Sequence, residues 1–320
     1  MDSENKKLTP LKFLTDIEQM PWGSAEYKLA DLGFVDSMAS EGWLGGNTLS
    51  DIMQTYLERV AGETSFEWYG TQFPILVKEL KVKGRTSLHI NPDDETAEQR
   101  YDAFGKTALW YVLDAGKDAT LYLGFKKPVS AEQLYMACQD GSVESLLHKV
   151  TPRKGEFYLI TPGMVHAAKD VTLLEIAESS ELWFRLHDWG SAERELHLEE
   201  AFDLIDLGAW INPLPRPQGT QVVSLPQFTV NAIPLSQALK SHRDEDDTFL
   251  LYITLEGEAV IQADSKNYSA KKGELVMIPA EVTDFAIMPA APDTRVLEVR
   301  MDPRPETDII SEPVEDGSQD

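Results

Sequence analysis

Hydrophobic and polar residues alternate in the same order at two places in the chain. The block from Gly155 to His166 opens with Gly-Glu, continues as an alternating apolar strand, breaks at a Pro turn and returns on a second strand. The block from Gly273 to Asp284 repeats this pattern without a gap, with Asp284 in the place of His166. A returning strand with one polar side chain at its start is typical of small β-barrels that point a functional group into their mouth. The repeat therefore predicts two related barrels, of which only the first keeps a metal-type residue there.

A second pair of segments supports this duplication. Residues 109–116 and 250–257 each predict a buried strand that ends in a Gly turn and is followed by another strand. Between the paired segments the first copy carries extra chain, residues 128–150, whose pattern predicts two short helices separated at Asp140-Gly141. We therefore expect an elaborated first barrel and a minimal second one.

The chain around the first barrel mixes helical and strand patterns. The apolar residues from Leu49 to Val60 share one helical face, and residues 92–100 read as an acidic helix start with Pro in its first turn. Residues 73–83 alternate as a strand, and residues 192–207 predict another helix. The aromatic residues of these regions, Trp110 and Trp183 among them, read as barrel packing.

Pro-rich segments mark the domain boundaries. The joint at residues 212–219 separates an expected site domain, residues 1–218, from a minimal second barrel, residues 219–302. Residues 303–320 are acidic and Pro-rich, and we expect them to form a mobile tail.

Composition excludes several classes of partner. With 29 basic and 54 acidic residues the formal net charge is −25, which repels nucleic acid and anionic membranes. The N-terminus has no apolar signal region and no long uncharged run occurs, so we expect a soluble protein that is not exported. Cys138 is the single cysteine, which permits no internal disulfide and fits a reducing cytoplasm.

An ordered series of motifs runs along the chain: residues 73–78 (Phe-Pro-Ile-Leu-Val-Lys), 88–95 (Leu-His-Ile-Asn-Pro-Asp-Asp-Glu), 104–113, the block ending at His166, 174–176 and 184–189. This series resembles the type I mannose-6-phosphate isomerases, most closely their short bacterial members. The resemblance covers the globular chain, and it implies a mainly β fold of two cupin (jelly-roll) barrels with helical insertions in the N-terminal part.

The resemblance implies one zinc ion, held by a Gln-x-His pair, a Glu and a His. In this chain these four positions carry His89, Asn91, Ala108 and His166. The expected metal residues are therefore His89, Asn91 and His166, while Ala108 occupies the position of the Glu ligand. Two imidazoles and an amide are a poor zinc donor set, so we expect zinc to bind weakly or not at all unless another group, such as Glu175, joins them.

The resemblance also implies the reaction, an interconversion of mannose 6-phosphate and fructose 6-phosphate through an enediol. Lys78, Lys106, Glu175 and Arg185 stand where the family has them. The expected acid/base groups are Lys78 and Glu175, and Arg185 steadies the developing charge or the phosphate. Lys106 and Arg185 are the expected substrate-binding residues for a small phosphosugar. These cations should make the mouth of the first barrel locally positive.

Other interpretations stay open at this point. His89 and His166 would also suit hydrogen-bonded core positions, Lys78 and Arg185 would suit ordinary ion pairs, and Asn91 would suit a helix cap. A catalytically inactive relative that binds a phosphosugar is a second functional hypothesis, because Ala108 has lost a carboxylate. A cupin isomerase with a changed sugar substrate is a third, because His89 is gained and the segment around Glu178 is altered.

Overall fold

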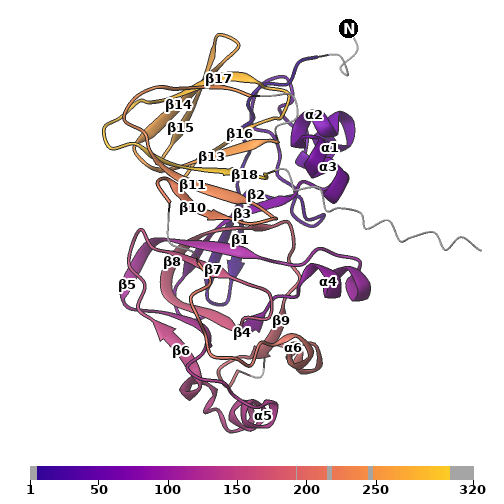
Figure 1. The fold of residues 1–320 in the computed structure, drawn as a ribbon, viewed down its shortest axis with the longest axis vertical. Coiled ribbons are helices and arrows are strands. Elements are labelled where there is room, and N and C mark those ends of the chain that lie inside the picture. The colour runs from indigo at the N-terminus through magenta and orange to yellow at the C-terminus, as the bar shows by residue number, and fades with distance from the viewer. Residues whose placement is uncertain (1–5, 192, 215–217, 244–247, 303–320) are drawn as a thin grey trace, which may run out of the picture.

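The chain folds mainly into β-structure, arranged in three sheets (Figure 1). The computed structural model describes residues 6–191, 193–214, 218–243 and 248–302. Nine strands before residue 190 form one sheet, and the strands after residue 218 form a five-stranded and a four-stranded sheet. The expected tail, residues 303–320, lies outside the described residues. No helix within the described ranges is long and apolar enough to cross a membrane.

The nine-stranded sheet is organised around strand β8 (His166–Glu178), which pairs with β3, β4 and β5 at the same time. All of these pairings are antiparallel. Because cross-strand neighbours share a face of the sheet, β8 brings side chains from distant parts of the sequence together. The other strands are β1 (Asp16–Met20), β2 (Gly23–Leu29), β3 (Ile75–Val82), β4 (Leu88–Ile90), β5 (Ala108–Phe125), β6 (Leu147–Val150), β7 (Phe157–Ile160) and β9 (Phe184–His187).

Strand β5 corrects one expectation. The sequence predicted a strand that ends in a turn at Gly116, but β5 runs unbroken through this glycine, and its ladder with β8 is interrupted between Ala115 and Thr120. A Cβ atom on Gly116 would lie 2.9 Å from the carbonyl oxygen of Asp170. The glycine therefore serves a close approach of two backbones rather than a turn.

The helices are shorter than the sequence suggests. The expected helix from Leu49 to Val60 is divided at Leu57, which has a left-handed φ of 49°. The one expected over 192–207 covers only Leu198–Leu204, and residues 128–150 contain one helix and a single 3-10 turn before β6. The helical elements are α1 (Leu49–Tyr56), α2 (Glu58–Ala61), α3 (Glu63–Tyr69), α4 (Asp94–Tyr101), α5 (Ala131–Asp140), η2 (Val143–Ser145) and α6 (Leu198–Leu204).

The C-terminal part places its two sheets around a core of its own. Side chains of Tyr252 and Ile278 from one sheet pack with Ile261 and Phe285 from the other. The five-stranded sheet contains β10 (Gln221–Ser224), β11 (Thr229–Pro234), β13 (Leu250–Glu256), β16 (Leu275–Ile278) and β18 (Arg295–Arg300). The four-stranded sheet contains β12 (Leu239–His242), β14 (Glu258–Ala263), β15 (Lys266–Lys271) and β17 (Asp284–Pro289).

The sequence repeat is confirmed in the strands. His166 begins β8 after the turn that follows β7, and Asp284 begins β17 after the turn that follows β16. A shared core joins the N-terminal and C-terminal parts, because Leu174 of β8 belongs to the same buried cluster as Ile253 and Leu297. The helices α1, α2 and α3 lie together beside the C-terminal sheets, whereas α4, α5 and α6 lie at the nine-stranded sheet (Figure 1).

Candidate functional site

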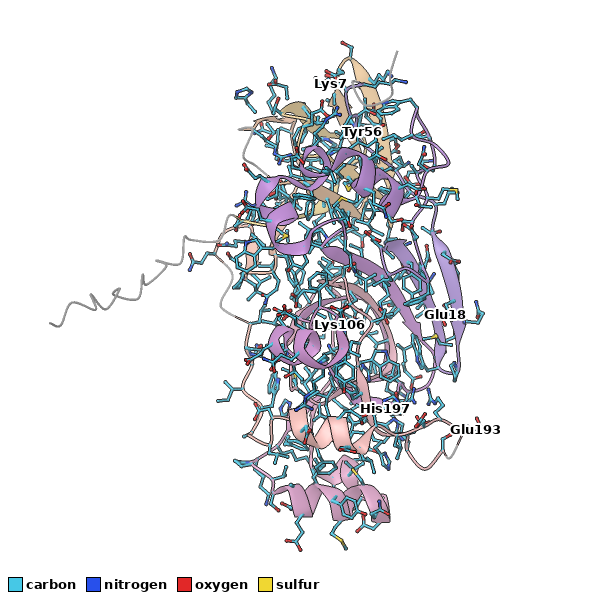
Figure 2. The ribbon with its side chains drawn as sticks, turned by 90° about the vertical axis from the view of Figure 1, so that its right-hand side faces the viewer. Lys7, Glu18, Tyr56, Lys106, Glu193 and His197 are labelled. Carbon is cyan, nitrogen blue, oxygen red and sulfur yellow. The ribbon has the colours of Figure 1, made fainter. Side chains whose placement is uncertain are left out.

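Strand pairing places three functional side chains side by side. Glu175 of β8 is in register with Lys78 of β3 on one side and with Trp110 of β5 on the other. All three side chains are buried, with at most 6% of any residue exposed. Lys106, just before β5, lies in the interior of the molecule, whereas Glu18 and Lys7 lie at its surface (Figure 2). The sheet thus holds one carboxylate between groups from two neighbouring strands.

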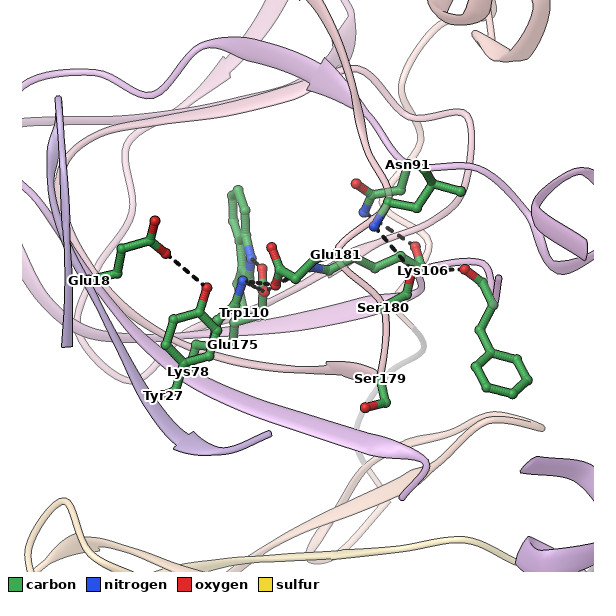
Figure 3. Close-up of polar contacts among 12 residues, drawn as sticks. Glu18, Tyr27, Lys78, Asn91, Lys106, Trp110, Glu175, Ser179, Ser180 and Glu181 are labelled. Carbon is green, nitrogen blue, oxygen red and sulfur yellow. Dashed lines mark hydrogen bonds and ion pairs between the residues drawn. The ribbon is translucent and has the colours of Figure 1, made fainter. Parts of the chain in front are cut away.

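Two lysines and two glutamates form a compact charged cluster (Figure 3). Oε1 of Glu175 lies 3.2 Å from the Lys78 ammonium and 3.3 Å from the Lys106 ammonium. Glu181, which the sequence analysis did not select, contacts both ammoniums as well, at 3.3 Å for Lys106. Trp110 donates a 2.8 Å hydrogen bond from Nε1 to the other oxygen of Glu175. The cluster is electrically balanced, as buried charges require.

These contacts fix the protonation states of the cluster. Burial raises the pKa of Glu175, but the ammoniums of Lys106 and Lys78 outweigh burial and hold this pKa well below its ordinary value. Burial lowers the pKa of Lys78, yet Glu175 and Glu181 reverse the effect and raise it. At neutral pH Lys78 therefore carries its proton and Glu175 carries none.

Two histidines stand next to this cluster. His89 of β4 and His166 of β8 are direct cross-strand partners, and their ring centroids are 4.2 Å apart. Nδ1 of His89 lies 2.9 Å from the carbonyl oxygen of Ser87, and Nδ1 of His166 lies 2.8 Å from that of Met164. A carbonyl oxygen only accepts, so each Nδ1 carries the proton and each Nε2 keeps a lone pair. Burial lowers the pKa of both imidazoles, that of His166 to about 4.

Both histidines and the charged cluster line one cavity of about 180 Å³. Arg185 of β9, the cross-strand partner of His89, lines it as well. Its guanidinium lies 4.8 Å from the ring centroid of Trp183, and its Nη1 donates a 2.6 Å hydrogen bond to the carbonyl oxygen of Glu195. Nε of Arg185 is buried and, within the described part of the chain, has no hydrogen-bond partner. Burial and the nearby Arg194 lower the pKa of Arg185.

The expected positive mouth needs a correction. Lys78 and Lys106 do line the cavity, but Glu175 and Glu181 line it too and neutralise them. Arg185 and the loop residue Arg194 carry the other positive charges of the lining. Arg194 in turn binds Asp188, with 2.8 Å between its Nε and Oδ2 of the carboxylate.

Asn91 does not cap a helix, as one interpretation of the sequence allowed. The N-cap of α4 is Asp93, whose side chain accepts a 2.7 Å hydrogen bond from the backbone N–H of Thr96. Asn91 is 2% exposed, and its Nδ2 donates a 3.3 Å hydrogen bond to the carbonyl oxygen of Lys106. The side-chain amide thus contacts the chain segment that carries Lys106.

The residues present do not fit a zinc ion of the kind that the resemblance implies. His89 and His166 offer two neutral nitrogens and Asn91 one amide oxygen, whereas Ala108 offers no donor. Across the described ranges, no group of three or more His, Cys, Asp and Glu side chains is placed to hold a metal ion. Glu175, the remaining candidate ligand, is engaged by two ammoniums and an indole. Zinc sites usually combine three or four such donors.

Three site residues could not be read from the sequence pattern. Glu181, Trp183 and Arg194 lie outside the strands and follow no strand or helix periodicity. Trp110 was read as barrel packing, but its indole N–H is also a hydrogen-bond donor to the central carboxylate. A buried Trp needs such a partner, which was the only signal available in advance.

Comparisons with known proteins agree with this geometry. Residues 219–290 match a family model described as the cupin domain of mannose-6-phosphate isomerase. The mannose-6-phosphate isomerase of Streptococcus mutans is 29% identical over 226 residues, which are 67% of this chain and 70% of that protein. The crystal structure of the Bacillus subtilis mannose 6-phosphate isomerase shares the fold with a TM-score of 0.79 and 22% identity, over 92% of this chain and 100% of that one.

A solved mannose 6-phosphate isomerase bound with zinc and yttrium has the same fold. Its TM-score is 0.74 at 15% identity, and the match covers 92% of this chain and 100% of that one. Zinc is thus found among the structural relatives, whereas this chain has its own set of donors. The resemblance that the motifs carry is confirmed.

Proposed function

We propose that the chain, which is similar to mannose-6-phosphate isomerases in sequence and fold, interconverts mannose 6-phosphate and fructose 6-phosphate through an enediol. The observation that carries this proposal is the buried Glu175 carboxylate, oriented by Trp110 and flanked by two ammoniums at the wall of a cavity. Such a site offers a proton acceptor beside groups that stabilise negative charge, which are the two requirements of an aldose–ketose isomerisation.

In this proposal Glu175 and Lys78 divide the proton transfers. Glu175 takes the proton from C2 of the open-chain aldose, and the electron pair moves onto O1 as the enediolate forms. Lys78 supplies a proton to the developing oxyanion on O1. O2 then returns a proton to the neutral Lys78 amine as it becomes the carbonyl oxygen, and the proton held by Glu175 goes to C1. The pKa directions give the starting protonation states for this division, because the folded protein keeps Lys78 protonated and Glu175 ionised.

Arg185 is the proposed phosphate-binding residue. Its guanidinium is stacked on Trp183 and tied to Glu195, so its orientation is fixed before substrate arrives. Its buried Nε would gain a partner when a phosphate oxygen binds. Lys106, the second proposed substrate-binding residue, lines the same cavity as part of the charged cluster. The two cations would thus contact one phosphosugar.

The domain division is part of the proposal. We assign residues 1–218 to an N-terminal site domain built on a first cupin barrel with helical insertions, and residues 219–302 to a second, minimal cupin barrel. The charged cluster, both histidines and Arg185 all come from the first of these. We further propose that His89 and His166 bind zinc weakly at most, so no step of the reaction is assigned to it.

The test is a coupled assay of fructose 6-phosphate formation from mannose 6-phosphate. The wild-type protein should turn over, and Glu175→Gln, which keeps the shape but loses the base, should lose turnover by roughly 10²–10⁴-fold. Wild-type protein that binds the phosphosugar without turnover would instead favour the inactive relative. Turnover of another sugar phosphate alone would favour the changed substrate.

A further inference from the structure

The further inference rests on the proposed isomerase function. We infer that the site works without a bound divalent cation: the Lys106 ammonium stabilises the enediolate oxygen, and the Nε2 atoms of His89 and His166 accept hydrogen bonds from sugar hydroxyls. Asn91 is then a positioning residue for Lys106 rather than a metal ligand. Three independent features of the site lead to this assignment.

The first feature is the use of the donor atoms. The side-chain Nδ2 of Asn91 points at the carbonyl oxygen of Lys106, at 3.3 Å, and the Lys106 backbone N–H donates a 3.1 Å hydrogen bond to the carbonyl oxygen of the next residue, Pro92. Asn91 and Pro92 therefore hydrogen-bond to both backbone groups of Lys106, its carbonyl oxygen and its N–H. These two hydrogen bonds form between protein groups alone and need no metal ion.

The second feature is the balance of charge. Lys78 and Lys106 carry two positive charges, and Glu175 and Glu181 carry two negative ones, all in contact with each other. A divalent cation on two neutral imidazoles would add two positive charges that no nearby carboxylate compensates. Such an excess is costly in a buried site. A phosphosugar that becomes an enediolate brings negative charge instead, and Arg185 and Arg194 line the same cavity.

The third feature is the strand geometry at Ala108. Ala108 is the first residue of β5, and Lys106 precedes it by two residues. Ala108 is 1% exposed, and its strand partners there are Ala177 and Ile160. The position is filled by apolar neighbours and offers no oxygen.

The experiment measures zinc and turnover on the same protein. Wild-type protein dialysed against a chelator should contain no stoichiometric zinc, and its kcat on mannose 6-phosphate should equal that of zinc-supplemented protein within about twofold. Lys106→Met should lower kcat by roughly 10²–10³-fold in both conditions, as expected when one oxyanion-stabilising donor is removed. Turnover that disappears with the chelator and returns with zinc would overturn the inference and leave the proposed function standing.

A binding measurement separates the inference from the proposed function. We would use 5-phosphoarabinonate, whose carboxylate resembles the enediolate, and titrate it calorimetrically into the chelated protein. Equal affinity with and without zinc, lost in Lys106→Met, supports the inference. Affinity that requires zinc overturns it. No affinity in either condition, together with no turnover, overturns both the inference and the proposed function.

Asn91→Ala tests the positioning role. It should lower kcat by a larger factor than it raises KM, because Lys106 also acts on charge that develops in the transition state. The matched control is Asn47→Ala, which removes a similar 2.8 Å hydrogen bond from an Asn side chain to the Leu44 carbonyl oxygen outside the site. Asn47→Ala should show no change in kcat. Equal kcat values for the two variants would remove Asn91 from the account.

Discussion

Nε1 of Trp110 donates a 2.8 Å hydrogen bond to Oε2 of Glu175, its cross-strand partner in the β5–β8 ladder. This bond assigns different tasks to the two carboxylate oxygens, because Oε1 faces the ammoniums of Lys78 and Lys106. The indole thereby fixes the rotation of the carboxylate and contributes to its low pKa. The register of two strands, rather than a local motif, sets up the centre of the site.

Trp110→Phe should reduce stability most clearly at neutral pH. The folded-state pKa of Glu175 is depressed, so its contribution to stability is present above the unfolded pKa and is lost as pH falls through the folded value. Loss of a buried hydrogen bond to a charged acceptor should cost about 1.5–3 kcal/mol in urea unfolding at pH 7. The difference in unfolding free energy between wild type and variant should become smaller at acidic pH.

The control for this variant is Trp68→Phe, at a residue that is 51% exposed. Its change in unfolding free energy should stay within about 0.5 kcal/mol. A Trp110→Phe protein that unfolds like this control would show that the indole N–H does not support Glu175.

Glu181→Gln should destabilise the protein, because Lys78 and Lys106 each lose an ion pair. Two ammoniums would then share one carboxylate in a largely buried cluster, and breaking buried pairs costs about 3–5 kcal/mol. The Glu181 side chain is 19% exposed, so the lower part of that range is expected. As a comparison, Asp203→Asn breaks the exposed pair with Arg100 and should cost less than about 1 kcal/mol in the same urea titration. Similar losses in both variants would contradict a charge-balanced cluster.

Arg185→Ala should weaken binding of mannose 6-phosphate by roughly 10–100-fold, because a charge-assisted contact to phosphate is removed. Binding of unphosphorylated mannose should not change, and isothermal titration with the two sugars tests this difference. Arg100→Ala, at the surface pair with Asp203, is the matched control. An equal loss of affinity for both sugars would show that Arg185 maintains the shape of the cavity and does not bind the phosphate.

Asp31→Asn should stabilise the protein at neutral pH. Burial raises the pKa of Asp31 to about 6, and the carboxyl accepts a 2.7 Å hydrogen bond from the Phe73 backbone N–H, which Asn can also accept. A raised pKa means that the stability contribution is full below the unfolded pKa of about 3.9 and is lost as pH rises through 6. The variant should gain about 1–3 kcal/mol at pH 7 and nearly nothing at pH 4. A gain that is the same at both pH values would rule out charge as its cause.

The sequence predicted the parts of the fold that depend on periodicity. The two blocks ending at His166 and Asp284 could be recognised because a strand repeats every two residues and a Pro turn interrupts it. The break of the first helix at Leu57 could not, since nothing in the residue type announces a left-handed φ. Gly116 gave a misleading signal, because a glycine for close backbone approach looks like a glycine for a turn.

The site was predictable only in part for a related reason. Lys78, Lys106, Glu175 and Arg185 belong to motifs, and the structure brings all four to one cavity. Glu181 and Arg194 come from loops, and their contacts depend on how strands far apart in sequence are paired. The contact of Asn91 with the Lys106 carbonyl oxygen involves the main chain, which no side-chain pattern records.

The most direct test of the central claim follows mannose 6-phosphate by proton NMR with the wild-type protein in D₂O. We predict that fructose 6-phosphate appears, and that Glu175→Gln abolishes this signal while the protein stays folded. Unchanged mannose 6-phosphate with folded wild-type protein, or a Glu175→Gln variant as active as the wild type, would contradict the account.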